Sequence, residues 1–333
     1  MPQSVAVIGA GSWGTALAVL LARNGHPVNL WARDAGHIAN LSKDRCNQRY
    51  LPGAYFPGNL AVTSDLDCAV KDSSILLIVV PSHAFRDLLH KLRHKSGSLQ
   101  IAWATKGLEC QSGKMLHEVV EEILGPDTPA AVLSGPTFAG EVAANQPTAI
   151  TVGSKNRVFA EIVAGLLRNP HFRAYTTDDM IGVQLGGATK NVLAIAAGMA
   201  DGLGFAANAR AALITRGLAE MMRLGLAMGG KPETLMGLAG VGDLILTCTD
   251  NQSRNRRFGL GMGKGLPREE VATQIGQEIE GVLTAGIIHR LAKTHHVDMP
   301  ITEQVYLILN EGLSPMEAVR NLLLREPKQE AGD

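Results

Sequence analysis

A glycine-rich turn near the start of the chain has the residue types and the position of a dinucleotide-binding motif. It reads Gly9-Ala10-Gly11-Ser12-Trp13-Gly14. It follows the apolar run Val5–Ile8 and leads directly into a helical pattern over Thr15–Asn24. Gly9 permits the tight turn, Gly11 lets a pyrophosphate approach the backbone, and Gly14 allows close packing of helix and strand. The turn therefore predicts a bound dinucleotide, the alternative being a turn that binds nothing.

The end of the next expected strand carries two neighbouring charges that favour different cofactors. An acidic residue here suits the ribose hydroxyls of NAD, whereas an arginine suits the 2′-phosphate of NADP. This chain has Arg33 followed by Asp34. Arg33 favours NADP and Asp34 favours NAD, so both cofactors stay open, with NADP preferred. An exposed charged pair without a ligand is the alternative.

A single lysine stands in a stripe of small residues in the second half of the chain. The stripe, spaced four residues apart, is Gly186, Lys190, Ala194 and Gly198. Residues at this spacing share one face of a helix. A ligand in such a groove would dehydrate Lys190 and lower its pKa toward the range useful for proton transfer. The alternative is that the stripe packs against a neighbouring helix and Lys190 reaches water.

A second polar cluster offers groups suited to a phosphate. Gly240-Val241-Gly242-Asp243 predicts a tight turn that presents a carboxylate, and Thr247 follows it. Ser253, Arg254 and Asn255 then supply a hydroxyl, a guanidinium and an amide. The alternative is a solvated basic face, because three arginines fall within four residues here. Nucleic acid is not expected as a partner, because no aromatic residues are interleaved with these arginines.

The elements that must position these residues fall into two classes along the chain. Short β-branched runs alternate with amphipathic segments up to about residue 177, which is typical of βαβ units around a parallel sheet. The expected strands are 5–9, 28–32, 61–63, 75–80, 100–104, 131–134, 149–152 and 173–176, and the expected helices between them include 13–24, 84–93 and 114–124. Beyond residue 178 only helices are expected, at 182–199, 206–228, 271–275, 284–292, 301–309 and 315–324.

The sequence thus predicts a Rossmann-type α/β domain with an extended sheet, residues 1–180, and an all-helical substrate-binding domain, residues 181–333. Lys plus Arg equals Asp plus Glu at 31 each, so no overall charge recruits nucleic acid or an anionic membrane. The most apolar stretch, Ile75–Pro81, is too short to span a bilayer. Four widely spaced cysteines without a CxxC pair fit free thiols in a reducing cytoplasm. Residues 328–333 are expected to form a disordered tail.

With these motifs in place, the sequence resembles the bacterial NAD(P)-dependent glycerol-3-phosphate dehydrogenases over nearly its whole length. The matching segments are GAGSWGTA at 9–16, Thr105-Lys106-Gly107, Leu133–Ala139, Lys190-Asn191-Val192, Gly240–Asp243, Ser253-Arg254-Asn255 and Glu280-Gly281. So many motifs in order are more specific than the first turn by itself. The resemblance implies reduction of dihydroxyacetone phosphate to sn-glycerol 3-phosphate for phospholipid synthesis, in the cytoplasm, by a homodimer.

The resemblance also implies roles for individual residues. Lys190 is expected to be the general acid/base, with Lys106 and Asp243 beside it. The expected substrate-binding residues are Lys106, Gly135, Thr137, Lys190, Asp243, Ser253, Arg254 and Asn255. The expected cofactor-binding residues are Gly9, Gly11, Ser12, Trp13, Gly14, Arg33, Lys106, Ala139, Arg254 and Glu280. Which neighbours of Glu280 contact the nicotinamide stays open.

Two rival functions remain at this stage. One is a two-domain dehydrogenase of a hydroxy acid or sugar acid, because a fold alone does not fix the substrate and Arg254 would also bind a carboxylate. The other is a non-catalytic dinucleotide sensor, which leaves the lone Lys190 and the phosphate cluster without a role. No metal site is expected: His90 and His94 are four residues apart on an expected helix but lack an acidic third ligand.

Overall fold

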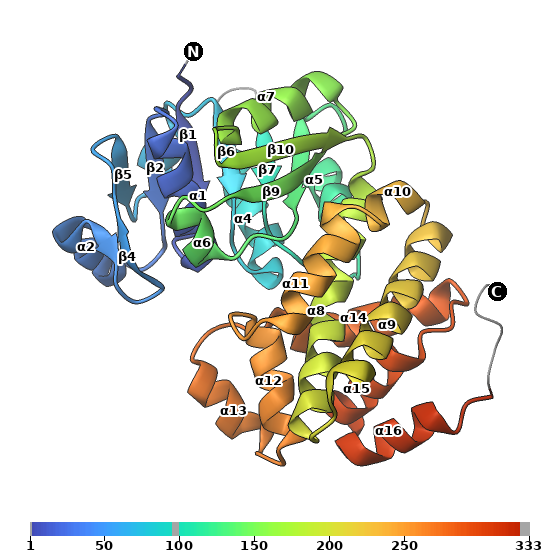
Figure 1. The fold of residues 1–333 in the computed structure, drawn as a ribbon. Coiled ribbons are helices and arrows are strands. Elements are labelled where there is room, and N and C mark those ends of the chain that lie inside the picture. The colour runs from blue at the N-terminus through green and yellow to red at the C-terminus, as the bar shows by residue number, and fades with distance from the viewer. Residues whose placement is uncertain (1, 95–99, 327–333) are drawn as a thin grey trace. The chain divides into compact units, whose positions relative to one another are not determined.

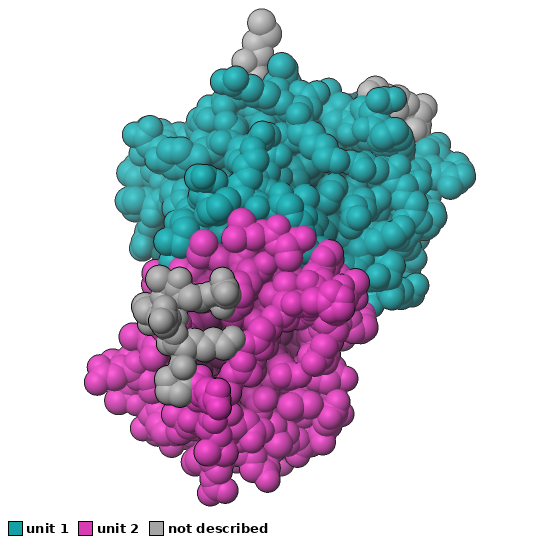
Figure 2. Space-filling model, turned by 90° about the vertical axis from the view of Figure 1, so that its right-hand side faces the viewer, with its two compact units in different colours: residues 1–188, 228–243 teal, residues 189–227, 244–333 magenta. Residues whose placement is uncertain are grey.

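The computed structural model describes residues 2–94 and 100–326 of the chain. It divides into two compact units, coloured separately in Figure 2. Unit 1 comprises Met1–Ala188 and Met228–Asp243, and unit 2 comprises Thr189–Ala227 and Leu244–Asp333. The domain boundary expected between residues 180 and 181 stays a prediction. The tail expected at 328–333 lies outside the described residues.

Unit 1 is built on a sheet of eight strands in the order β10-β9-β8-β7-β6-β1-β2-β5 (Figure 1). The strands are β1 Val5–Ile8, β2 Val28–Trp31, β5 Leu60–Thr63, β6 Ile75–Ile78, β7 Ile101–Trp103, β8 Ala130–Ser134, β9 Thr148–Gly153 and β10 Phe172–Thr177. Every pair is parallel except β8 with β9. Each strand overlaps one expected from the sequence, so the α/β class with an extended sheet is confirmed.

Helices cover both faces of this sheet, as adjacent residues of β1 show. Val5 and Val7 enter one hydrophobic cluster, whereas Ala6 and Ile8 enter another, because successive side chains of a strand point to opposite faces. The first cluster includes residues of α1 Ser12–Arg23, α6 Ala139–Ala143 and α7 Arg157–Leu167, and the second includes residues of α3 Leu66–Val70, α4 Phe85–Leu92 and α5 Leu116–Leu124. Burial on both faces explains why β6 is apolar throughout.

Beyond β2 the chain forms elements that the sequence pattern did not predict. Helix α2, Ala35–Asp44, is followed by a two-stranded antiparallel ribbon of β3 Cys46–Asn47 and β4 Leu51–Tyr55. β4 contains Pro52 and Gly53, which are typical of turns rather than of strands. This segment matters because, as shown below, it holds the glycine-rich turn in place.

Unit 2 consists of helices, and no strand occurs among the described residues after Thr177. The all-helical class expected for the second half is therefore confirmed. Its helices are α8 Met180–Gly202, α9 Ala207–Ala227, α11 Asp243–Thr249, α12 Arg254–Gly263, α13 Arg268–Ile275, α14 Glu280–Thr294, α15 Pro300–Glu311 and α16 Pro315–Leu323. Of these, α8 and α11 begin in unit 1. Unit 1 also holds α10 Pro232–Leu235 and the π-helical turn η2 Leu238–Gly242.

Small residues on α8 let the backbone of other elements come close. A Cβ on Gly198 would overlap the carbonyl oxygen of Arg256 in α12, and one on Gly186 would overlap that of Ala239 in η2. On α12, a Cβ on Gly259 would overlap the carbonyl oxygen of Ile195. The stripe thus packs against protein backbone at these glycines. Lys190 does not reach water as the packing alternative proposed, because it is only 6% exposed.

Three further observations concern the expectations about membranes, thiols and metals. Within residues 2–94 and 100–326, no helix has both the length and the hydropathy needed to cross a bilayer. None of the four cysteines, all of which the structure describes, forms a disulfide bond; Cys46 and Cys248 are buried and Cys68 is exposed. The part of the chain that the structure describes contains no group of three or more metal-ligating side chains.

Candidate active site

The glycine-rich turn joins β1 to α1 with a geometry that accounts for each glycine. Gly9 has a φ of +124°, and a Cβ there would lie 2.5 Å from the carbonyl oxygen of Val79. A Cβ on Gly14 would overlap the carbonyl oxygen of Gly9. A Cβ on Gly11, in contrast, would meet no heavy atom of the described residues within 4 Å. Protein packing thus requires Gly9 and Gly14, whereas Gly11 borders open space.

Helix α1 begins at this turn without a side-chain cap. Its N-cap residue is Gly11, no cap hydrogen bond from a side chain is present there, and its first turn contains no acidic residue. The N–H groups of the first turn and the positive end of the helix dipole therefore favour an anion. Trp13 is partly buried against the core beside this end, and its indole N–H has no acceptor among the described residues.

The segment that follows α2 is hydrogen-bonded to the glycine-rich turn. The Asn47 side-chain amide donates to the carbonyl oxygen of Ala10 at 3.0 Å and to Thr15 Oγ1 at 2.8 Å. The Ser12 hydroxyl donates to the carbonyl oxygen of Tyr50 at 2.7 Å. Sequence analysis singled out Ser12 but not Asn47, which lies 37 residues from Ala10 and carries no local signal of this contact.

Arg33 and Asp34 lie exposed after β2, and Asp34 has a structural role that the sequence did not reveal. It is the N-cap of α2, and its carboxylate accepts a hydrogen bond of 3.1 Å from the backbone N–H of His37. That hydrogen bond lowers the pKa of Asp34, so the carboxylate is ionised at neutral pH. Asp34 therefore presents a fixed negative charge at the end of β2.

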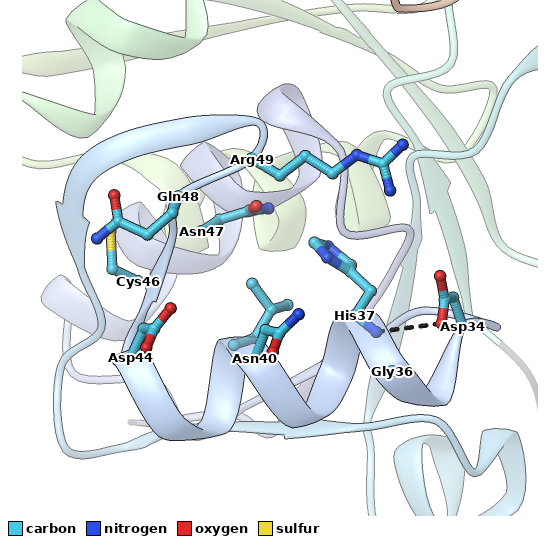
Figure 3. A pocket seen from close by; sticks show the side chains of 10 residues that line it. Asp34, Gly36, His37, Asn40, Asp44, Cys46, Asn47, Gln48 and Arg49 are labelled. Atoms are coloured by element: carbon cyan, nitrogen blue, oxygen red, sulfur yellow. Dashed lines mark hydrogen bonds between the residues drawn. The ribbon is translucent and has the colours of Figure 1, made fainter.

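A cavity of about 320 Å³ opens between α2 and the segment that follows it (Figure 3). Its lining residues are Asp34, Gly36, His37, Asn40, Leu41, Asp44, Cys46, Asn47, Gln48 and Arg49. Arg49 lies over the ring of Tyr50 at 4.9 Å, and the ring of His37 packs edge-on against the same tyrosine. Asn47 therefore lines the cavity and also contacts the glycine-rich turn. Tyr50, which contacts both Arg49 and His37, accepts a hydrogen bond from Ser12 of the same turn.

Four of the expected substrate-binding residues belong to unit 1, and the structure brings them together. Lys106 Nζ donates to Asp243 Oδ2 at 2.7 Å and to the carbonyl oxygen of Gly135 at 3.1 Å. The Thr137 hydroxyl donates to the same Gly135 carbonyl, also at 3.1 Å. The side chain of Asp243 is 1% exposed and that of Lys106 16%. An ammonium is thereby held against a carboxylate that is almost fully removed from water.

Ser134 belongs to this group, although sequence analysis gave it no role. Its hydroxyl lies 3.5 Å from Asp243 Oδ2, and it is buried. It is the last residue of β8, and it lies next to Gly135 within the matching segment Leu133–Ala139. Gly135 itself has a φ of +158°, and a Cβ there would lie 3.1 Å from Cα of Ile150. A larger residue at position 135 would therefore press on the backbone of β9 at Ile150.

Lys190 is held inside unit 2 by a threonine. Its Nζ donates to Thr247 Oγ1 at 2.9 Å, and the two residues are 6% and 4% exposed. Thr247 follows Asp243 by four residues on α11, so these two side chains share one face of that helix. The four-residue spacing from Asp243 could have placed Thr247 beside Lys190. The sequence analysis placed Asp243 there instead.

The expected phosphate cluster forms the start of α12. Ser253 is the N-cap, and its hydroxyl accepts from the backbone N–H of Arg256 at 3.2 Å. The Asn255 side chain donates to Asn191 Oδ1 at 3.0 Å and accepts from the backbone N–H of Gly281 at 2.9 Å. Asn255 thus joins α12 to α8 and to the start of α14. Its amide retains a further donor and acceptor position for a ligand.

The three arginines of this segment differ, which corrects the alternative of a solvated basic face. Arg256 is 7% exposed, donates to the Cys248 carbonyl at 2.9 Å, and contacts Asn251 and Asp201. Arg254 is partly buried, with burial lowering its pKa and the charge of Glu280 opposing that shift. Arg257 is exposed. Arg256 therefore stabilises the fold, and Arg254 lies close to Glu280 as a candidate ligand-binding cation.

Comparisons with known proteins agree with this arrangement. The sequence profile for the NAD-dependent glycerol-3-phosphate dehydrogenase N-terminus matches residues 4–160, and that for the C-terminus matches residues 179–320. A glycerol-3-phosphate dehydrogenase [NAD(P)+] of Methylococcus capsulatus is 62% identical over 332 residues, 99% of each chain. One from Edwardsiella ictaluri is 56% identical over 329 residues, 98% of this chain and 97% of the other.

A solved structure extends the similarity to three dimensions. The crystal structure of glycerol-3-phosphate dehydrogenase from Coxiella burnetii superposes with a TM-score of 0.94 at 50% sequence identity, covering 97% of this chain and 99% of that one. The family expected from the sequence motifs is thereby confirmed over both halves of the chain. This chain belongs to the NAD-dependent glycerol-3-phosphate dehydrogenase family.

Proposed function

We propose that this chain is an NAD(P)-dependent oxidoreductase that reduces dihydroxyacetone phosphate to sn-glycerol 3-phosphate. The observation that carries the proposal is the buried Lys190, held by Thr247 within a chain that is 62% identical to a glycerol-3-phosphate dehydrogenase. A lysine removed from water is suited to donate a proton to an oxygen that gains negative charge during reduction.

The glycine-rich turn fits the pyrophosphate of a dinucleotide. Open space borders Gly11, and the uncapped start of α1 offers N–H groups to an anion. We expect Gly9, Gly11, Ser12, Trp13 and Gly14 to hold this part of the cofactor. Arg33, Lys106, Ala139, Arg254 and Glu280 complete the expected cofactor set. A bound reduced nicotinamide supplies the hydride that the reduction requires.

The residues of the chain supply the proton and the charge that complement this chemistry. Lys190, in its ammonium form, hydrogen-bonds the substrate carbonyl and donates its proton to the alkoxide that forms. Thr247 orients Nζ by accepting one of its hydrogen bonds. The Lys106 ammonium stabilises developing negative charge, and Asp243 fixes the position of that ammonium. Gly135 and Thr137 shape the substrate site around Lys106.

The phosphate of the substrate is expected to bind at the start of α12. Arg254 supplies a fixed positive charge, and Ser253 and Asn255 supply polar groups at the positive end of the helix dipole. Binding of this remote group orients the carbonyl at the reacting end. This site also discriminates against the rival substrates, because a hydroxy acid or a sugar acid lacks the phosphate dianion.

Oxidation of the reduced cofactor, followed at 340 nm, tests the proposal. We expect turnover with dihydroxyacetone phosphate, little with dihydroxyacetone, and none with 2-oxo acids. Lys190→Ala should lower kcat by about 100-fold or more with a smaller change in KM, the range that general acid catalysis spans. Lys293→Ala, at a lysine whose side chain is 68% exposed, is the control and should leave turnover unchanged.

The possible negative outcomes separate the rivals. Turnover of a 2-oxo acid in place of dihydroxyacetone phosphate would establish a hydroxy acid dehydrogenase. Dinucleotide binding without turnover of any of these substrates would establish a sensor.

We also propose that the enzyme is a cytoplasmic homodimer that supplies sn-glycerol 3-phosphate for phospholipid synthesis. The balance of 31 basic and 31 acidic residues and the four cysteines without a disulfide bond support a reducing compartment without membrane recruitment. Light scattering coupled to size-exclusion chromatography tests the assembly: a homodimer has about twice the 35.3 kDa of one chain. A mass equal to one chain at micromolar concentration would contradict it.

A further inference from the structure

The loop that carries Lys106 contains a buried charge for which the proposed reaction gives no role. This loop, residues 104–115, connects β7 to α5. From it the Lys106 ammonium reaches Asp243, as described above. Glu109, three residues further on, is only 4% exposed. Removing an ionised carboxylate from water is costly unless it is paired and hydrogen-bonded, so the partners of Glu109 decide what it does.

The Glu109 carboxylate accepts hydrogen bonds on both of its oxygens. Oε1 accepts from Nε of Arg86, on α4, at 3.0 Å. Oε2 accepts from the backbone N–H of Ser112 at 2.9 Å and from the Ser112 hydroxyl. Burial acts to raise the pKa of Glu109, but these hydrogen bonds outweigh it, so the pKa lies below its ordinary value and the carboxylate is ionised at neutral pH. A buried anion thus joins the loop to α4.

Arg86 is itself held by a second carboxylate. Its two terminal nitrogens donate to the two carboxylate oxygens of Glu122, on α5, at 2.9 Å and 3.1 Å. A paired contact of this kind fixes the plane of a guanidinium as well as its position. Helices α4 and α5 pack against each other on the same face of the sheet (Figure 1). Glu109 is therefore bound to a cation that two packed helices hold in place.

Lys106 lies between anchored residues of the loop. Directly before it, the Thr105 hydroxyl donates to the carbonyl oxygen of Val80 at 2.7 Å. After it, Leu108 is fully buried and leads into Glu109. Because the backbone is fixed on both sides, the point from which the Lys106 side chain extends is fixed as well.

The buried pair of Arg86 and Glu109 is better suited to fixing a position than to stabilising the fold. Replacing a buried ion pair by apolar side chains is often neutral or stabilising, because both charges lose their hydration on burial. Its hydrogen bonds, in contrast, have a defined direction. Precise placement matters for a group that acts on a transition state, since a displacement of about 1 Å can lower a rate by about 100-fold.

We propose that Glu109 is a positioning residue for Lys106, because its hydrogen bonds to Arg86 fix the loop from which the Lys106 ammonium reaches the substrate. The inference rests on the proposed function, in which that ammonium stabilises developing negative charge. Loss of the Glu109 carboxylate should leave the sheet and its helices in place but let the ammonium move away from Asp243.

A double-mutant cycle of unfolding in urea tests the proposal without catalysis. Glu109→Gln keeps the shape of the side chain but removes its charge and turns one acceptor into a donor. The hydrogen bonds of Glu109 go elsewhere, so coupling to Asp243 has to pass through the loop. Asp243→Asn should therefore lower the free energy of unfolding less in the Glu109→Gln background than in wild type. Ser112→Ala, which removes one donor to Glu109, should show the same coupling more weakly and serves if Glu109→Gln does not fold.

Glu161→Gln is the matched control. The Glu161 carboxylate on α7 also accepts from an arginine and a hydroxyl, those of Arg168 and Thr176, each at 2.8 Å. It is exposed, however, and α7 does not carry the Lys106 loop. Its effect on the free energy of unfolding should simply add to that of Asp243→Asn.

Turnover of dihydroxyacetone phosphate supplies the second readout. Glu109→Gln should lower kcat by about 10-fold or more with a smaller change in KM, while Glu161→Gln stays within about 2-fold of wild type. Lys106→Met removes the ammonium, so adding Glu109→Gln to it should change the residual kcat by less than about 2-fold. A general loss of structure would instead lower kcat by the same factor in both backgrounds.

The outcomes separate this inference from the proposed function. Additive effects of Glu109→Gln and Asp243→Asn on unfolding, as in the control, would overturn the positioning role. An equal loss of kcat on adding Glu109→Gln to wild type and to Lys106→Met would overturn it as well. Coupling in unfolding together with no turnover of dihydroxyacetone phosphate by wild type would reject the proposed reaction and leave the positioning of Lys106 in place.

Discussion

The ammonium of Lys190 and the hydroxyl of Thr247 are joined by a hydrogen bond of 2.9 Å in a region from which water is almost excluded. The lysine comes from α8 and the threonine from α11, 57 residues further along the chain. A long, flexible side chain loses considerable conformational freedom when it is fixed in this way. The fold therefore holds Nζ in one place, as proton transfer in a fixed geometry requires.

Replacing Thr247 should impair catalysis more than substrate binding. Thr247→Val keeps the shape but removes the acceptor for Lys190, so kcat should fall by about 10- to 100-fold, the loss of a hydrogen bond to a charged group, with a smaller change in KM. Thr247→Ser retains the hydroxyl and should stay within about 3-fold of wild type. The pH profile of kcat should move in the valine variant. A valine variant with wild-type kcat would remove Thr247 from the mechanism.

The pair of Lys106 and Asp243 should contribute to stability as well as to the site. Asp243→Asn leaves the Lys106 ammonium, 16% exposed, without its counter-charge, and we expect a loss of about 2 kcal/mol or more in the free energy of unfolding in urea. Asp178→Asn is the matched control, because Asp178 pairs with Lys231 on the surface, with exposures of 71% and 52%. It should lower the free energy of unfolding much less, because water screens an exposed ion pair. Equal losses in the two variants would contradict the prediction.

Two glycine-to-alanine changes should have opposite effects on stability, because one glycine lies at the contact between α8 and α12 and the other has open space around it on α7. Gly198→Ala inserts a methyl group against the Arg256 carbonyl and should destabilise the protein by about 1 to 3 kcal/mol. Gly165→Ala lies on α7, where a Cβ would meet no described atom within 4 Å, and should stabilise it by about 0.5 to 1 kcal/mol. Thermal unfolding of both variants decides the matter. A stable Gly198→Ala variant would mean that the two helices can separate without cost.

Glu220 should make stability depend on pH in a direction unusual for a carboxylate. Burial raises its pKa to about 7, although the N–H groups of Ile301 and Thr302, to which it is hydrogen-bonded, act in the opposite direction. Because the folded state then binds this proton more tightly than the unfolded state, whose pKa is near the ordinary value of about 4.3, stability falls as the pH rises between these values. The whole span is on the order of 3 kcal/mol.

Glu220→Gln tests this, because glutamine does not ionise. The free energy of unfolding, measured in urea from pH 4.5 to 7.5, should decline less steeply in the variant than in wild type. Glu122 provides a contrast: hydrogen bonds from Arg86 and Lys114 lower its pKa to about 2, so any stabilisation it provides is present above its ordinary pKa and is lost as the pH falls toward 2. Identical slopes for wild type and Glu220→Gln would show that Glu220 keeps one charge state across this range.

Several features follow from the sequence because they depend on residues close together in the chain. All eight strands of the main sheet overlap strands expected from short β-branched runs, and the second half is helical, since periodicity reports local structure directly. The motif assigned Gly9 to the tight turn and Gly14 to close packing of helix and strand, and the structure supplies the backbone contacts that require both. The family was likewise readable from motifs in their order along the chain.

Other features depend on which distant elements meet, and only the tertiary structure decided them. Lys106 and Asp243 are 137 residues apart, and Asn47 reaches Ala10 across 37 residues, with no local signal of either contact. The three arginines of Asn251–Arg257 are indistinguishable by type, yet packing buries Arg256 and exposes Arg257. The sequence thus determined which chemical groups are present and on which elements they lie. Their burial and pairing arise from the packing of those elements, because a side chain's environment is made mostly by residues remote in the chain.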